Sequence, residues 1–170
     1  MTSKLKTDVL ETGSGSGTIA LNNQLSGMTA ASMPSGSVVK SVIIKDTAYV
    51  GSNSTSWVLA ATFSITGVLA NSKVQIEASI NHLIENVGYG IFAIFKGSTE
   101  LVRSVHNTAG MGSWTQALNT IYVEDTTPSV GTNTYTVKFY STTAATTVFY
   151  NYNSNTTHAA SFYKLTEIKG

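Results

Sequence analysis

The stretch that decides the fold class runs from Lys73 to His82 and reads K-V-Q-I-E-A-S-I-N-H. Apolar residues alternate in it with Lys, Gln, Glu, Ser and Asn. Because successive side chains of a β-strand point to opposite faces, this alternation predicts a strand with one buried and one exposed face. His82 continues the apolar face, so we expect it to be a buried, hydrogen-bonded histidine.

Other short segments repeat this pattern, and none of them shows a helical period. The odd-numbered residues from Trp57 to Ile65 are apolar and are expected on one face, as are Tyr135, Val137 and Phe139. The expected strands are 38–46, 57–66, 73–82, 88–96, 99–106, 114–123, 132–141, 146–152 and 158–168. They predict an all-β protein, an antiparallel β-sandwich that is jelly-roll-like.

One strand differs from the others, because Gly90 to Phe95 is apolar on both faces. Such a strand belongs in the centre of a sandwich or against a neighbouring subunit, and we expect it to take part in a trimer interface. Directly after it, Gly97 in the run Phe95 to Thr99 predicts a tight hairpin turn, since glycine permits the positive φ that such turns require.

The first 37 residues have a different character. They contain Gly13-Ser14-Gly15-Ser16-Gly17 and few large apolar side chains, and Met33-Pro34-Ser35-Gly36 separates them from the strand-rich remainder of the chain. The glycine run lacks the Gly-Lys-Ser/Thr of a phosphate loop and is expected to be a flexible turn. We therefore predict an extended N-terminal attachment or assembly arm over residues 1–37 and a knob domain over residues 38–170.

The composition excludes several classes of function. Charged residues are 11% of the chain, against roughly 25% in an average soluble protein, whereas Ser and Thr make up 46 of the 170 residues. The net charge is +1 and the basic residues are scattered, so we expect no nucleic-acid partner. There is no cysteine and no apolar run long enough to insert in a membrane, and we expect no signal peptide. A weakly charged, strand-rich surface favours an oligomer.

Residues that could perform catalysis or bind a metal are few. The three histidines, His82, His106 and His158, lie 24 and 52 residues apart, so we expect no metal site and no cofactor. Glu124 and Asp125 are the one acidic pair, and adjacent strand residues point to opposite faces. We expect this pair to be a solvated strand end, and we expect no enzyme.

Aromatic rings and amides gather in the run from Phe149 to Asn155. Such side chains can stack on sugars and hydrogen-bond to them, which makes this run a candidate glycan-binding tip. The alternative is that the rings pack against another subunit. The candidate residues are Trp114, Tyr150, Asn151 and Tyr152.

A family resemblance covers nearly the whole chain. Ser3 to Thr12, followed by Thr18-Ile19-Ala20-Leu21, resembles the leader of fibre-like proteins of tailed bacteriophages, especially marine and cyanobacterial ones. The body is similar to the C-terminal domain of those proteins at Phe63 to Thr66, at Phe95 to Leu101 and at Ala160 to Ile168. The resemblance implies a virion structural protein, often a trimer with a jelly-roll-like knob.

The expected function is therefore a non-enzymatic virion structural protein, a homotrimeric knob displayed as a fibre-type appendage that adheres to host glycans. The alternative is a capsid decoration protein that stabilises the head, and a carbohydrate-active enzyme is a distant third. We expect a small appendage or a decoration protein rather than a complete long fibre, because the chain is short. The expected partners are further copies of the chain, other capsid or tail proteins bound through the arm, and host-surface glycans. We expect the protein on the virion surface after assembly in the host cytoplasm.

Overall fold

The computed structural model describes residues 29–108, 114–152 and 159–170. The chain divides into two units, Met1–Ser32 and Met33–Gly170. Most of the predicted arm, including its glycine run and the leader that carries the resemblance, lies outside the described residues. The described part of the first unit includes one short 3-10 helix, η1 (Ala30–Ser32).

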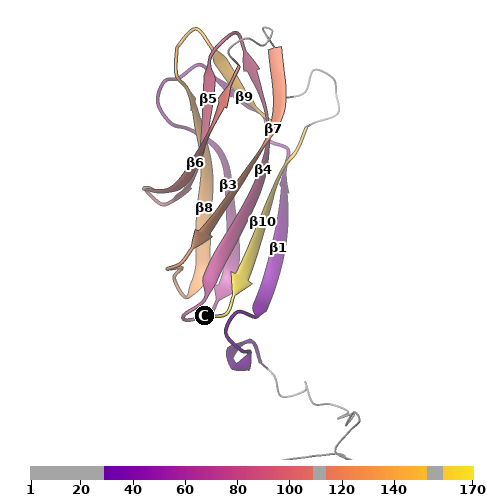
Figure 1. Ribbon diagram of the computed structural model, residues 1–170, viewed down its shortest axis with the longest axis vertical. Coiled ribbons are helices and arrows are strands. Elements are labelled where there is room, and N and C mark those ends of the chain that lie inside the picture. Colours follow the sequence, from indigo (N-terminus) through magenta and orange to yellow (C-terminus); the bar gives the residue numbers. More distant parts are fainter. Residues whose placement is uncertain (1–28, 109–113, 153–158) are drawn as a thin grey trace, which may run out of the picture. The chain divides into compact units, whose positions relative to one another are not determined.

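The second unit contains the strands (Figure 1). Their bounds are β1 (Val38–Asp46), β2 (Val50–Ser52), β3 (Val58–Val68), β4 (Lys73–Glu85), β5 (Tyr89–Lys96), β6 (Thr99–Asn107), β7 (Trp114–Asp125), β8 (Gly131–Ser141), β9 (Thr147–Tyr150) and β10 (Ser161–Ile168). The backbones of Gly36 and Ser37 hydrogen-bond to that of Lys169, so the last residues before β1 pair with the end of the chain.

All strand pairs are antiparallel, and the strands form two sheets. The six-stranded sheet has the order β1-β10-β4-β9-β2, with β7 paired to β4, and the four-stranded sheet has the order β3-β8-β5-β6. Successive strands mostly cross from one sheet to the other, and β5 and β6 form a hairpin within one sheet. This interleaving of two packed sheets is the arrangement of a jelly roll, so the predicted fold class is confirmed.

The alternation of Lys73 to His82 is confirmed, because the even-numbered side chains of β4 from Val74 to His82 are buried. Gly97 lies in the two-residue turn between β5 and β6 and has a φ of 60°, as the hairpin prediction requires. Strand β2, which has three residues and pairs with β9, is absent from the strands expected from the sequence.

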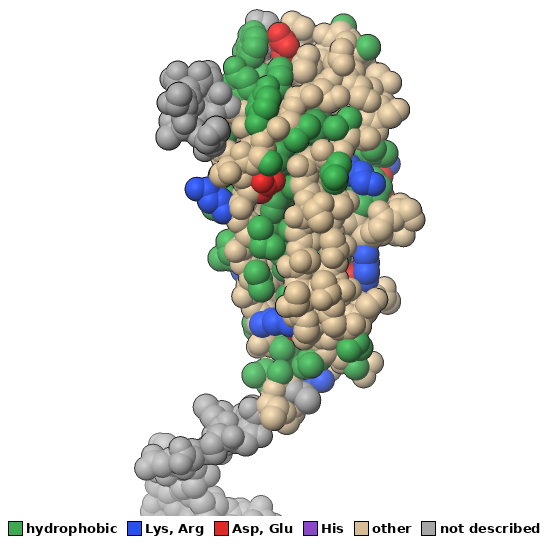
Figure 2. All heavy atoms as spheres, turned by 180° about the vertical axis from the view of Figure 1, so that it is seen from behind, with side chains coloured by type: hydrophobic (Ala, Val, Ile, Leu, Met, Phe, Trp, Pro, Cys, Tyr) green, Lys and Arg blue, Asp and Glu red, His purple; other side chains and the backbone are tan. Residues whose placement is uncertain are grey.

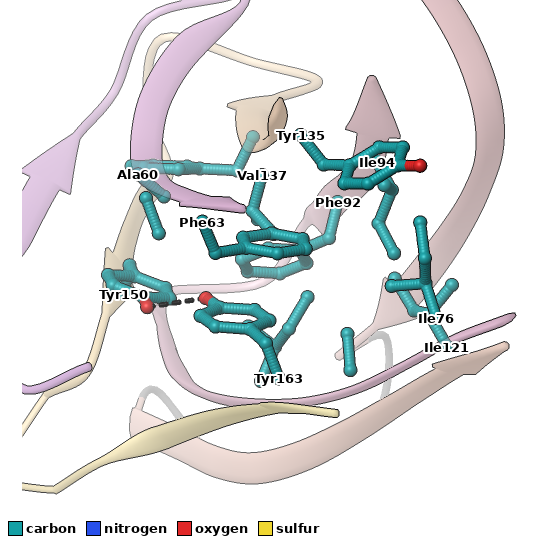
Figure 3. Close-up of a cluster of buried hydrophobic side chains, with 14 of the residues drawn as sticks. Ala60, Phe63, Ile76, Phe92, Ile94, Ile121, Tyr135, Val137, Tyr150 and Tyr163 are labelled. Carbon is teal, nitrogen blue, oxygen red and sulfur yellow. Dashed lines mark hydrogen bonds between the residues drawn. The ribbon is translucent and has the colours of Figure 1, made fainter. Parts of the chain in front are cut away.

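The core lies between the sheets and is rich in large rings (Figure 3). The rings of Phe63 from β3 and Tyr163 from β10 stack with their centroids 4.2 Å apart and an interplanar angle of 2°. Tyr135, Val137 and Phe139 of β8 are fully buried, as the alternation predicts. Core side chains from both sheets therefore interdigitate in one continuous cluster.

The prediction that the odd-numbered residues from Trp57 to Ile65 share one face is wrong for the first part of this run and right for the last part. Phe63 and Ile65 are buried, but the pairing of β3 with β8 shifts between Leu59 and Ala61, and Leu59 is 53% exposed. An extra residue in one strand of a pair turns the side chains before it to the other face. The irregularity therefore places Leu59 on the outer surface.

Candidate functional site

Strand β9 places Tyr150 in the core, so this residue is separated from the exposed candidate Trp114. Tyr150 is fully buried, and its hydroxyl donates to Asp46 Oδ2 at 2.5 Å and accepts a hydrogen bond from Tyr163 at 2.5 Å (Figure 3). Burial, with the neighbouring Tyr163 and Asp46, raises the pKa of Tyr150. This ring stabilises the sandwich and faces neither a ligand nor another subunit.

Asn151 is also buried and serves the fold. Its amide nitrogen donates to the backbone oxygens of Asp46 and Ala48, both at 3.0 Å, and its oxygen accepts from Ser161 Oγ at 2.7 Å. Asn151 adopts a φ of 52°, which asparagine tolerates better than most residues. The expectation that Tyr150 and Asn151 contact a ligand or a subunit interface is therefore corrected.

Trp114 and Tyr152 come together with two rings that the candidate set did not contain, Tyr49 and Phe149. We call these four residues the aromatic cluster. The ring of Phe149 lies 5.9 Å from Tyr49, 6.3 Å from Trp114 and 5.3 Å from Tyr152, measured between centroids. The planes of Phe149 and Trp114 differ by 10° and those of Phe149 and Tyr49 by 20°. Offset, near-parallel rings of this kind form one connected apolar surface.

The strands explain how the aromatic cluster forms. Phe149 points outward from β9 because Tyr150, the next residue, points inward. Across from Phe149 on β2 stands Gly51, and a Cβ at Gly51 would lie 2.6 Å from the Phe149 ring, so glycine makes room for it. Trp114 opens β7, and both it and Tyr49 are more than half exposed.

Amides lie beside the aromatic cluster. Gln116 Nε2 donates to Asn81 Oδ1 and to the backbone oxygen of Tyr152, both at 3.4 Å. Exposed rings with adjacent amides can stack on the apolar face of a sugar ring and hydrogen-bond to its hydroxyls. Within the described residues, the aromatic cluster is therefore the candidate functional site.

The cluster lies at one end of a larger surface, the outer side of the six-stranded sheet. Strand register places Ile43, Lys164, Glu77 and Tyr122 in one row across it, and Phe162 in the next row. Exposed apolar side chains mark this surface, which we call the apolar face: Ile43, Leu118, Tyr122 and Phe162, with exposed fractions of 70%, 61%, 55% and 45%.

The outer side of the four-stranded sheet behaves differently, and we call it the covered face. Phe95 points outward from β5 yet is 5% exposed, because Trp57 packs against it at a ring distance of 5.1 Å. Tyr140 lies 4.7 Å from Trp57, and Lys138 Nζ lies 4.5 Å above the Phe95 ring. Gly90 to Phe95 is thus central in its sheet and buried by the chain itself. A neighbouring subunit is not needed to cover it.

The acidic pair does not form one site. Glu124 lies on the outer side and pairs with Lys73 at 2.9 Å. Asp125 points inward, is nearly buried, pairs with Lys96 at 2.7 Å and accepts a hydrogen bond from Tyr135 at 2.8 Å. The expected opposite orientation is confirmed, whereas Asp125 is a buried structural carboxylate and not a solvated one.

The charged side chains of the described part are mostly used in such local pairs. The ion pairs are Lys40–Glu167, Lys73–Glu124, Lys96–Asp125, Arg103–Glu100 and Lys164–Glu77. On the side of the molecule shown in Figure 2, Lys and Arg side chains lie apart from one another. In the part of the chain that the structure describes, no helix has the length and apolar character of a membrane span.

His82 is buried and hydrogen-bonded, as its place in the alternation predicts. Its Nδ1 lies 3.3 Å from the Ile80 carbonyl oxygen, and its Nε2 contacts His106 Nδ1. Burial lowers the pKa of His82 from 6.5 to about 4, and burial also lowers the pKa of His106. Both imidazoles are therefore neutral at pH 7.

The solved structures that match this chain include two remote likenesses. The disulfide-linked pili of Bacillus endospore appendages match at 15% identity and a TM-score of 0.37, over 81% of this chain and 96% of that chain. The VP2 subviral particle of infectious bursal disease virus matches at 9% identity and a TM-score of 0.25, over 75% of this chain and 41% of that chain. No family model and no curated protein matches. Likenesses this remote do not assign a function.

Proposed function

We propose that this chain is a non-enzymatic structural protein of a bacteriophage surface, a fibre-type knob that contacts host glycans through the aromatic cluster. The observation that carries the proposal is the position of the cluster in the six-stranded sheet. Trp114 pairs with Glu85 at one end of β4, and the first residue of β1, Val38, pairs with Ile168, which pairs with Lys73 at the other end. The chain therefore enters the sandwich at the end opposite to the cluster.

The distance between these ends suits a knob that is attached at one end and makes contacts at the other. Strand β4 has 13 residues, which spans about 40 Å at the usual rise per residue. A receptor-binding surface near Trp114 then lies at the opposite end of the sandwich from Val38, where β1 begins. The proposed arm, Met1 to Ser37, binds other virion proteins.

The knob is proposed to be a homotrimer that associates through the apolar face. Ile43, Leu118 and Phe162 leave apolar surface in water in the isolated chain, at a cost of about 25 cal/mol per Å² relative to burial. Lys164 and Lys73 on this face are each paired with a glutamate of the same face, so charge repulsion between copies is small. A closed ring of copies covers such a surface without leaving an open edge.

The absence of catalysis is part of the proposal. Hydrolysis of a glycoside needs two free carboxyl groups about 5 to 10 Å apart across a groove. The acidic pair does not supply them, because Glu124 pairs with Lys73 and Asp125 is held by Lys96 and Tyr135. Glycans bound at the aromatic cluster are therefore expected to be released unchanged.

Glycan adhesion is tested with the full-length protein on host cells and on a glycan array. Substitution of Trp114→Ala together with Tyr152→Ala is expected to lower binding about tenfold or more, because stacking is lost at each site and avidity multiplies the loss. Tyr89→Ala is the matched control, since Tyr89 is an exposed ring on the four-stranded sheet, whereas the cluster belongs to the six-stranded sheet. Equal binding by both variants would contradict the adhesion proposal.

The position on the particle is tested separately by imaging labelled virions. Label at the tail is expected for a fibre-type appendage. Label distributed over the head would instead favour the capsid decoration protein, in which the apolar face would lie against the shell.

A further inference from the structure

The two sheets meet along one open side of the sandwich, between the edge strands β6 and β7. His82 points into this side from β4, and His106 points into it from β6. Their rings are perpendicular, at 89°, with centroids 4.7 Å apart, and His82 Nε2 contacts His106 Nδ1. Two imidazole nitrogens from different sheets therefore converge at one point.

The hydrogen bond of His82 Nδ1 determines which nitrogen of this ring is free to bind a ligand. A backbone carbonyl can only accept a hydrogen bond, so the proton of His82 lies on Nδ1 and is donated to Ile80. His82 Nε2 then carries its lone pair toward His106. Histidines that bind metals generally orient themselves in this way, with the other ring N–H donated to a carbonyl or carboxylate.

A third polar side chain at the same place has one atom without a hydrogen-bond partner. Asn119, from β7, accepts a hydrogen bond from Ser104 Oγ at 3.0 Å through Oδ1, whereas its buried Nδ2 makes no hydrogen bond. A half turn of the amide would let Nδ2 donate to Ser104 and would leave Oδ1 as the atom without a partner. Buried polar atoms without a partner are uncommon and often indicate a missing water or ion.

The three side chains share one pocket. It has a volume of about 160 Å³ and is lined by His82, Val105, His106, Ala117, Leu118 and Asn119. The pocket is open to solvent and has room for water molecules beside the imidazoles. Among the described residues no three His, Cys, Asp or Glu side chains form a metal cluster, so a metal here would need the amide of Asn119 as well.

We propose that His82 Nε2, His106 Nδ1 and the amide oxygen of Asn119 bind a divalent first-row transition ion, with water in the remaining positions. Imidazole is a preferred ligand of Zn²⁺, Cu²⁺ and Ni²⁺. The ion replaces the hydrogen bond between the two histidines, with the proton of His106 carried on Nε2 instead of Nδ1, and it joins β4 and β7 of one sheet to β6 of the other. With one amide and two imidazoles the site binds less tightly than a four-ligand structural zinc site. Its role is to stabilise the open side of the sandwich.

This site goes beyond the proposed adhesion and does not depend on it. The expectation of no metal rests on the spacing of the histidines along the chain. A spacing of 24 residues is uninformative when the two strands that carry them belong to different sheets.

The test uses the full-length protein, freed of metal with a chelator, and adds Zn²⁺, Ni²⁺ or Cu²⁺ alone at pH 7.5. Calorimetry is expected to show one site per chain and a raised melting temperature. His106→Gln is expected to weaken metal binding about tenfold or more and to abolish the rise in melting temperature, since even the loss of an outer-shell partner of a metal ligand costs about that much affinity. His158→Gln is the control and is expected to leave both unchanged.

A second measurement covers the case in which His106→Gln fails to fold. The electron paramagnetic resonance spectrum of the Cu²⁺-loaded wild-type protein is expected to show coupling to two imidazole nitrogens, and it is expected to persist in His158→Gln. No binding at millimolar metal, loss of binding in His158→Gln, or a spectrum without two imidazole nitrogens would each overturn the proposal.

Discussion

The apolar face and the covered face are both outer sides of a sheet in the same sandwich, yet they treat exposed hydrophobic side chains differently. On the covered face the chain buries Phe95 of the inner strand β5 with Trp57, although Phe95 points away from the core, and leaves Leu59 of the edge strand β3 53% exposed. On the apolar face Leu118 and Ile43 remain in water. The chain covers Phe95 with its own residues but leaves Ile43 and Leu118 in water, and we propose that this open side is where further copies bind.

Few residues are needed to bury Phe95 on the covered face. Trp57 lies just before β3 and contacts Phe95 and Tyr140 edge to face, and Arg103 lies 5.9 Å above its ring. Such contacts contribute beyond the area that they bury. No comparable lid exists over Leu118 in the described part of the chain, since its side chain is 61% exposed.

The two tryptophans provide the strongest way to break this comparison. Trp57→Ala is expected to destabilise the isolated chain by about 2 to 3 kcal/mol, somewhat below the cost for a fully buried tryptophan. Trp114→Ala, on the other face, is expected to cost less than about 1 kcal/mol, since Trp114 is 54% exposed. Urea unfolding monitored by circular dichroism measures both, and equal losses would contradict the distinction between the faces.

High pH tests the stability of the core that lies between the two faces. Burial, with the hydrogen bond to Asp125, raises the pKa of Tyr135 above its ordinary value of 10.0, and burial raises the pKa of Tyr163. The folded state therefore keeps these protons when the unfolded state releases them. The stability that these two buried tyrosines give the folded state is complete below pH 10 and is lost as the pH rises above it.

The expected loss is at most about 1.4 kcal/mol per tyrosine for each pH unit above 10. Urea midpoints measured from pH 8 to 11 test it, with Tyr135→Phe as the control, which is expected to flatten the slope. A midpoint that stays constant up to pH 11 would show that the buried tyrosines do not hold their protons more tightly than exposed ones.

A smaller effect comes from the two exposed leucines. Leu118→Ser and Leu59→Ser are each expected to change the stability of the isolated chain by less than about 0.5 kcal/mol, because both side chains are more than half exposed. Thermal unfolding at low protein concentration measures this. If Leu118→Ser alone is strongly destabilising under these conditions, Leu118 is part of the core packing and the apolar face is not a free surface.

Most of the fold could be predicted from the sequence, because a sandwich with one core imposes alternation on nearly every strand. Lys73 to His82 and Tyr135 to Phe139 illustrate this. The irregularity at Leu59 could not be predicted, since apolar residues continue through it and only the pairing with β8 reveals the shift. The short strand β2 carries too few residues for a pattern.

The candidate site was less predictable. The run from Phe149 to Tyr152 shows that rings gather there, and β9 then places Tyr150 inside while Phe149 faces out. The alternation of β9 could have separated these two rings. Tyr49 could not have been found, because it joins the aromatic cluster through the pairing of β2 with β9, about a hundred residues apart in sequence.

The central claim, that copies associate through the apolar face, is tested most directly by the mass of the full-length protein in solution. Multi-angle light scattering at micromolar concentration is expected to give three times the chain mass of 18.0 kDa for the wild type and for Leu59→Lys, which changes the covered side. Leu118→Lys is expected to give the mass of one chain, because a charge in the buried interface has no partner. A monomeric wild type, or a Leu118→Lys variant that assembles as well as Leu59→Lys, would contradict the account.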